Sequence, residues 1–165
     1  MESRVFIVGL IVGILATVTM DVVAMITLRL GIAGRGPRRT GPDLIGRWIG
    51  YLLRGKFRHT DILQTPPLRG ELVLGLTAHY LIGVVLTLLY LGLLIVAHGT
   101  PTALSAILYG AATTALPWFL MFPSQGFGWL GRYASGDAHL ARVSLFNHII
   151  FGLAIALWMA VLRPI

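Results

Sequence analysis

Residues 72–97 decide the fold class, and they read LVLGLTAHYLIGVVLTLLYLGLLIVA. The run contains no Asp, Glu, Lys or Arg, and most of its side chains are aliphatic. A helix needs about 20 predominantly apolar residues to cross the hydrocarbon core of a bilayer. Because lipid offers the backbone no hydrogen-bond partner, a spanning segment of this kind must be helical. The stretch therefore predicts a transmembrane helix.

Three further segments have the same character, at about residues 5–28, 102–122 and 143–162. The first is too long for the core of a cleaved secretory signal, which is about 7–15 residues, and no small-residue cleavage site follows it. We expect a single integral membrane domain over residues 1–165. The predicted fold class is all-α: a polytopic membrane protein built as a bundle of four transmembrane helices.

The composition supports a membrane protein and excludes several kinds of site. The chain is 56% hydrophobic and 12% charged, whereas a soluble domain carries about 25% charge. Its mean hydropathy is +0.83. The absence of cysteine excludes disulfides, thiolate metal sites and cysteine nucleophiles.

The basic residues are distributed unevenly between the two sides that these spans would define. One side holds only Arg4 and Arg163, and the other holds the remaining eleven of the 13 basic residues: Arg29, Arg35, Arg38, Arg39, Arg47, Arg54, Lys56, Arg58, Arg69, Arg132 and Arg142. Positively charged loops face the cytoplasm. The long loops are therefore predicted to be cytoplasmic and both termini periplasmic. Because topology accounts for the net charge of +7, the predicted partner is the lipid bilayer and not nucleic acid.

The loop at residues 31–70 contains a further helical pattern over about residues 43–55. Its apolar side chains recur at helical spacing, and basic residues surround them. This pattern is typical of an amphipathic helix lying in the membrane interface. We expect Trp48, Arg47 and Arg54 at the headgroup level, and His59 with Asp61 in a solvated part of the same loop.

Each predicted span carries one ridge of small and polar residues four apart. Asp21, His79 and His148 lie on three of these ridges. Small residues mark the faces where membrane helices approach one another. At 1.5 Å per residue, each of the three polar residues lies about 9–12 Å from the cytoplasmic end of its span. They are therefore expected to share one layer inside the bundle, where a partner would offset the cost of about 2.5–3.5 kcal/mol for a buried aspartate.

Two imidazoles and a carboxylate in one layer suggest a cofactor site. His79, His148 and Asp21, with Glu71 as a further candidate, would suit zinc or non-haem iron, and two facing imidazoles would suit a haem. A protein with such a site would act on an apolar or lipid substrate, although no motif in the chain names a reaction. For Glu71 the alternative is an acid at a helix N-terminus near the headgroups.

Two other classes of function remain open from the same residues. In a small transporter or proton-relay channel, Asp21 and the histidines would be the coupling site, and Pro117 would kink the third span beside it. Four spans are few for transport, so a homodimer would be expected. In a scaffold or assembly subunit, the small ridges would instead bind another protein of a larger membrane complex.

The order of several short motifs resembles one family. They are Gly46-Arg-Trp48, His59, Gly70-Glu71, Ala78-His-Tyr80, Pro123 with Gly126 and Gly128, and His148 with Phe151-Gly152. They look like the bacterial four-span inner-membrane family known as domain of unknown function twenty-nine thirty-eight, over nearly the whole chain. The resemblance implies four helices in a bacterial inner membrane and implies no activity.

Overall fold

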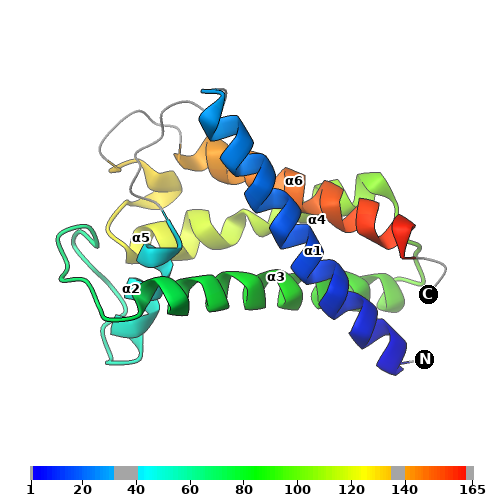
Figure 1. The fold of residues 1–165 in the computed structure, drawn as a ribbon, viewed down its shortest axis with the longest axis horizontal. Coiled ribbons are helices and arrows are strands. Elements are labelled where there is room, and N and C mark those ends of the chain that lie inside the picture. The colour runs from blue at the N-terminus through cyan, green and yellow to red at the C-terminus, as the bar shows by residue number, and fades with distance from the viewer. Residues whose placement is uncertain (1, 32–40, 135–139, 163–165) are drawn as a thin grey trace. The chain divides into compact units, whose positions relative to one another are not determined.

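The computed structural model describes residues 2–31, 41–134 and 140–162, which form helices joined by turns and irregular segments, with no strand (Figure 1). The elements in chain order are α1 (Glu2–Arg29), α2 (Pro42–Leu52), α3 (Glu71–Val96), α4 (Ala103–Thr113), the π-helix η1 (Pro117–Met121), α5 (Phe122–Ser124), the 3-10 turn η2 (Trp129–Gly131) and α6 (Leu140–Val161). The predicted all-α fold class is confirmed.

Four helices are long and apolar enough to cross a membrane. They are Arg4–Arg29, Glu71–Val96, Ala103–Ser124 and Leu140–Val161. These bounds agree with the four predicted spans to within a few residues. The chain is therefore a multi-pass membrane protein by the length and composition of its helices.

The chain forms two compact units, each with its own apolar core. Unit 1 comprises Met1–Leu30, Tyr80–Thr114 and Leu145–Ile165, and unit 2 comprises Gly31–His79 and Ala115–Ser144. The core of unit 1 is built around Val12, Tyr90 and Ile155. The core of unit 2 is built around Leu44, Ile62 and Phe122.

The helices of unit 1 approach one another at the predicted small ridges. A Cβ atom on Gly13 of α1 would lie 2.6 Å from the Cα atom of Val84 in α3. A Cβ atom on Gly110 of α4 would overlap the carbonyl oxygen of His148 and lie 2.9 Å from the Cα atom of Gly152 in α6. Close backbone approach of this kind strengthens packing between membrane helices. The ridges on α1, α4 and α6 are therefore confirmed as packing faces.

Polar side chains also link the helices of unit 1. The indole N–H of Trp158 in α6 donates to the hydroxyl of Thr19 in α1 at 3.0 Å. The hydroxyl of Tyr109 in α4 donates to the carbonyl oxygen of Leu86 in α3 at 2.6 Å. In an apolar environment these bonds satisfy groups that would otherwise lack partners.

The third span changes its helical geometry near the proline that was expected to kink it. Helix α4 ends at Thr113, and the π-helical turn begins at Pro117. Proline has no N–H to donate to the preceding turn, and its ring collides with the carbonyl four residues earlier. The hydrogen-bond pattern of the span therefore changes at Pro117, and the kink expected there stays a prediction.

In unit 2, helix α2 packs tightly against the first turns of α3. It begins with Pro42 at its first position and has Asp43 in its first turn, as the sequence predicted. A Cβ atom on Gly46 would overlap the carbonyl oxygen of Glu71, and one on Gly75 would overlap that of Pro42. The predicted helix over residues 43–55 is thus confirmed, although it ends at Leu52 because a turn with Gly55 at φ +82° follows it.

Candidate functional site

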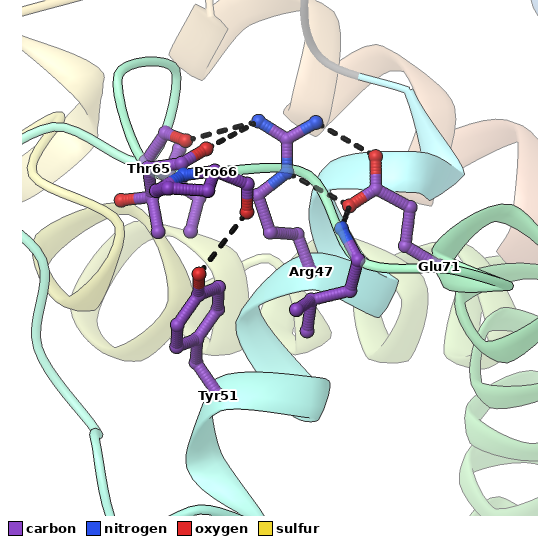
Figure 2. A network of polar contacts seen from close by, with 7 residues as sticks. Arg47, Tyr51, Thr65, Pro66 and Glu71 are labelled. Atoms are coloured by element: carbon purple, nitrogen blue, oxygen red, sulfur yellow. Dashed lines mark hydrogen bonds and ion pairs between the residues drawn. The ribbon is translucent and has the colours of Figure 1, made fainter.

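A two-bonded ion pair joins α2 to the start of α3 in unit 2. The Nε atom of Arg47 donates to Oε2 of Glu71 at 2.9 Å, and Nη2 donates to Oε1 at 2.7 Å. The backbone N–H of Leu68 also donates to Oε2 of Glu71, at 2.7 Å. Figure 2 shows the guanidinium aligned with the carboxylate. Paired bonds of this geometry are among the stronger polar contacts in proteins.

The remaining nitrogen of the Arg47 guanidinium binds the loop that precedes α3. Its Nη1 atom donates to the carbonyl oxygens of Thr65 at 3.1 Å and Ile62 at 3.3 Å (Figure 2). Arg47 is only 9% exposed, so its guanidinium faces the interior of unit 2, and its expected position in the membrane interface beside Trp48 and Arg54 stays a prediction. The spacing offered a signal: Arg47 stands three residues after the buried Leu44 and therefore shares its helix face.

The hydrogen bonds between Arg47 and Glu71 favour the charged form of the arginine. The hydrogen bond from Glu71 raises the pKa of Arg47, and this effect outweighs the opposing effect of burial. Each carboxylate oxygen of Glu71 already accepts from Arg47, and Oε2 accepts from Leu68 as well. Glu71 is thus the acid in the first turn of α3, as one of its two interpretations held, and its role as a metal ligand stays a hypothesis.

His59 is buried in unit 2, which corrects the expectation of a solvated loop residue. Its side chain is 5% exposed, and its Nδ1 atom lies 3.1 Å from the hydroxyl oxygen of Thr65. That hydroxyl donates to the carbonyl oxygen of Asp61, so Nδ1 carries the proton and donates to Thr65. Burial, assisted by the nearby positive charge of Lys56, lowers the pKa of His59 and favours the neutral imidazole.

The loop around His59 is bonded to the C-terminal end of α5. The backbone N–H of His59 donates to the carbonyl oxygen of Ser124 at 2.8 Å, and that of Ile62 donates to Gln125 at 3.0 Å. Three buried nitrogen atoms in this region have no hydrogen-bond partner among the described residues: His59 Nε2, Trp118 Nε1 and Gln125 Nε2. The sequence did not reveal this cluster, because the pairing of residues 59–62 with 124–125 is a long-range contact between two irregular segments.

Two hydrogen-bonded pairs link the membrane helices of unit 1, and each pair joins a titratable side chain to a hydroxyl. The hydroxyl of Tyr80 in α3 donates to Oδ2 of Asp21 in α1 at 3.1 Å. The hydroxyl oxygen of Thr113 in α4 lies 2.7 Å from Nδ1 of His148 in α6. Each titratable group therefore has a hydroxyl partner on a different helix. Tyr80 was not predicted as a site residue, although a phenol inside an apolar run was the available signal.

The four candidate metal ligands are divided between the two units. Asp21 and His148 belong to unit 1, whereas His79 and Glu71 belong to unit 2, so the convergence of Asp21, His79 and His148 stays a prediction. Within residues 2–31, 41–134 and 140–162, no group of three or more His, Asp or Glu side chains is arranged to hold a metal ion. The metal and haem hypotheses have no support from the described residues.

Comparison with protein families gives one result that covers almost the whole chain. A family model described as "Protein of unknown function (DUF2938)" matches residues 10–162. The chain belongs to this family. The match extends across all four candidate spans, so the resemblance inferred from the short motifs is confirmed. The DUF2938 description assigns no activity, and comparisons with curated proteins and with solved structures gave no match.

Proposed function

We propose that this DUF2938 protein moves protons across the bacterial inner membrane, alone or coupled to another solute, with Asp21 and Tyr80 as the central proton-handling pair. The observation that carries the proposal is the hydrogen bond from the Tyr80 hydroxyl to Oδ2 of Asp21, between α1 and α3. Both residues lie inside candidate spans. Ionisable groups in such positions are expensive and commonly mark proton or substrate pathways.

The phenol allows Asp21 to exist in both protonation states. A carboxylate in an apolar span is unstable without a hydrogen-bond donor, and Tyr80 supplies one for the charged form. When Asp21 binds a proton, the carboxylic acid becomes a donor as well as an acceptor, and the same phenol oxygen accepts from it. Reversal of the hydrogen bond therefore accompanies proton uptake without separation of the two helices.

The Thr113–His148 pair supplies a second group suited to proton transfer. The Thr113 hydroxyl donates to the carbonyl oxygen of Gly110 at 2.6 Å, so Nδ1 of His148 is the donor in its 2.7 Å contact with Thr113. The basic lone pair of the neutral ring is then on Nε2. Imidazole is the side chain whose ordinary pKa lies closest to neutrality, which makes it an effective proton relay.

The proposed function also requires an orientation in the membrane and an oligomeric state. The eleven basic residues on one side support cytoplasmic long loops and periplasmic termini. Because four spans enclose little space, we expect the working form to be a homodimer in the bilayer.

Proton flux into liposomes tests the proposed function. Purified protein is reconstituted with an entrapped pH-sensitive dye, and a potassium diffusion potential drives protons inward. We expect wild-type protein to acidify the lumen faster than protein-free liposomes, Asp21→Asn to abolish the difference, and Tyr80→Phe to reduce it. Asp43→Asn is the matched control, since it removes a carboxylate from the first turn of α2, outside the spans.

Two results would contradict the proposal. Wild-type flux equal to that of protein-free liposomes, across a range of candidate co-solutes, would leave the scaffold interpretation in its place. Flux retained in Asp21→Asn would show that another residue carries the proton. Elemental analysis and an absorption spectrum of the same preparation test the metal and haem hypotheses separately.

A further inference from the structure

Unit 2 contains a polar depression that is separate from the Asp21–Tyr80 pair. Its volume is about 290 Å³, and its lining includes Tyr51, Lys56, Thr60, Asp61, Gln64 and Thr65. The depression lies between the end of α2 and the loop that leads to α3. Nothing in the proposed proton pathway uses it.

The lining holds one basic side chain, Lys56, and one acidic side chain, Asp61, and a second basic side chain, Arg54, lies beside it. The ammonium of Lys56 lies 5.6 Å from the centre of the Tyr51 ring, and the guanidinium carbon of Arg54 lies 5.8 Å from the same ring. Within the described part of the chain, neither cation forms an ion pair. The one acidic lining residue, Asp61, is engaged by its own turn, because its oxygens accept from Leu63 N–H at 2.9 Å and from Gln64 Nε2 at 3.1 Å.

Exposed apolar side chains alternate with the basic residues beside the depression. Leu53 is 78% exposed and Phe57 is 39% exposed, and they flank Arg54 and Lys56 in the chain. The indole N–H of Trp48 donates to the carbonyl oxygen of Phe57 at 2.9 Å, which fixes this turn to α2. Basic and bulky apolar residues combined in this way are typical of segments that enter the headgroup region of a membrane.

From these three observations we infer that the depression binds the phosphate of an anionic phospholipid headgroup. Lys56 provides the positive charge, and the exposed hydroxyl of Thr60 provides a hydrogen-bond donor. Leu53 and Phe57 contact the acyl region of the same leaflet. A soluble phosphate ester offers the same anion, but the exposed apolar residues favour the lipid as its source.

Lipid binding to the delipidated full-length protein tests the inference. Native mass spectrometry in detergent measures the apparent Kd of phosphatidylglycerol and of phosphatidylcholine with identical acyl chains. We expect tighter binding of phosphatidylglycerol, and Lys56→Gln should weaken that binding about fivefold, the value of one basic residue near an anionic headgroup. Arg69→Gln is the matched control, because it removes an exposed positive charge from the same loop outside the depression. Equal affinity for the two lipids, or an equal loss in Arg69→Gln, would overturn the inference.

A second arm distinguishes the lipid from a soluble phosphate ester. Glycerol 3-phosphate is added as a competitor, and Leu53→Ser removes an apolar contact while leaving every charge in place. We expect no displacement by glycerol 3-phosphate and weaker binding of both lipids to Leu53→Ser. Displacement by glycerol 3-phosphate, with Leu53→Ser unchanged, would overturn the assignment to lipid. Both substituted side chains are exposed, so an unchanged unfolding temperature confirms that the variants are folded.

Discussion

The guanidinium of Arg47 and the carboxylate of Glu71 form two nearly parallel hydrogen bonds, at 2.9 and 2.7 Å, across the contact between α2 and α3. The exposed fractions of their side chains are 11% and 12%. Because Arg47 also binds the carbonyl oxygens of Ile62 and Thr65, one side chain connects the amphipathic helix, the loop and the second span. The pair therefore holds three segments of unit 2 together.

Removal of either charge should destabilise unit 2 strongly. Loss of one partner of a buried ion pair leaves the other uncompensated, which costs about 3–5 kcal/mol. We expect Arg47→Gln and Glu71→Gln each to lower the free energy of unfolding by that order, measured by denaturant titration in detergent micelles. Arg54→Gln is the control, because that residue is exposed and should change stability by less than about 0.5 kcal/mol.

The double variant separates a true pair from two independent effects. Arg47→Gln with Glu71→Gln leaves neither charge unpaired, so its loss should be clearly smaller than the sum of the two single losses. Strict additivity would contradict the mutual stabilisation seen in the geometry.

Glycine at the crossing of α2 and α3 should be irreplaceable. A Cβ atom on Gly75 would overlap the backbone carbonyl of Pro42, and backbone cannot rotate away as a side chain can. We expect Gly75→Ala to destabilise by at least about 1–3 kcal/mol, the usual cost of overpacking. Gly92→Ala is the matched control on the same helix, since nothing lies within 4 Å of its added Cβ atom. Equal stability of the two variants would contradict the close approach of α2 and α3.

The spans and their packing ridges could be predicted from the sequence because both follow from local patterns. Apolar length predicts a membrane helix, and the period of small residues predicts its packing face, as Gly13 and Gly110 demonstrate. The environment of Arg47 could not be predicted in this way. Helical spacing places Arg47 on the face of Leu44, but the burial of its charge depends on Glu71, which is 24 residues away and which no local pattern identifies.

The same distinction explains the error at His59. A loop rich in polar and basic residues is expected to be solvated, but the bonds from His59 to Ser124 and from Ile62 to Gln125 cover it with a distant segment. Asp21 illustrates the intermediate case. Its need for a partner was predictable from the free-energy cost of a carboxylate in lipid, whereas the identity of Tyr80 required the relative rotation of α1 and α3.

Stability should decline in mildly acidic solution because of His59. The folded protein favours its neutral form and lowers its pKa, so below the ordinary value of 6.5 the unfolded chain binds more protons. The contribution is fully present above pH 6.5 and is lost as the pH falls toward the folded pKa. We expect the free energy of unfolding to fall over that interval in the wild type and to change less in His59→Gln, which keeps a donor for Thr65 but does not titrate.

A surface histidine provides the control for this pH effect. His98 is exposed between α3 and α4, and His98→Asn suits its positive φ of 49°. Unfolding measured from pH 5 to pH 8 should give His98→Asn the slope of the wild type. A slope unchanged in His59→Gln would show that another group is responsible.

The proposed orientation predicts which loops a membrane-impermeant thiol reagent can reach. The chain has no cysteine, so single substitutions need no prior removal of native thiols. Pro67→Cys lies in the first long loop and Thr100→Cys lies between α3 and α4, and both positions are exposed. If the basic loops are cytoplasmic, intact spheroplasts should label Thr100→Cys and spare Pro67→Cys, whereas inside-out vesicles should reverse the result. Leu89→Cys, which is 54% exposed on a span, should resist the reagent in both preparations because lipid covers it. Labelling of Pro67→Cys in intact spheroplasts would place the basic loop outside and contradict the proposed orientation.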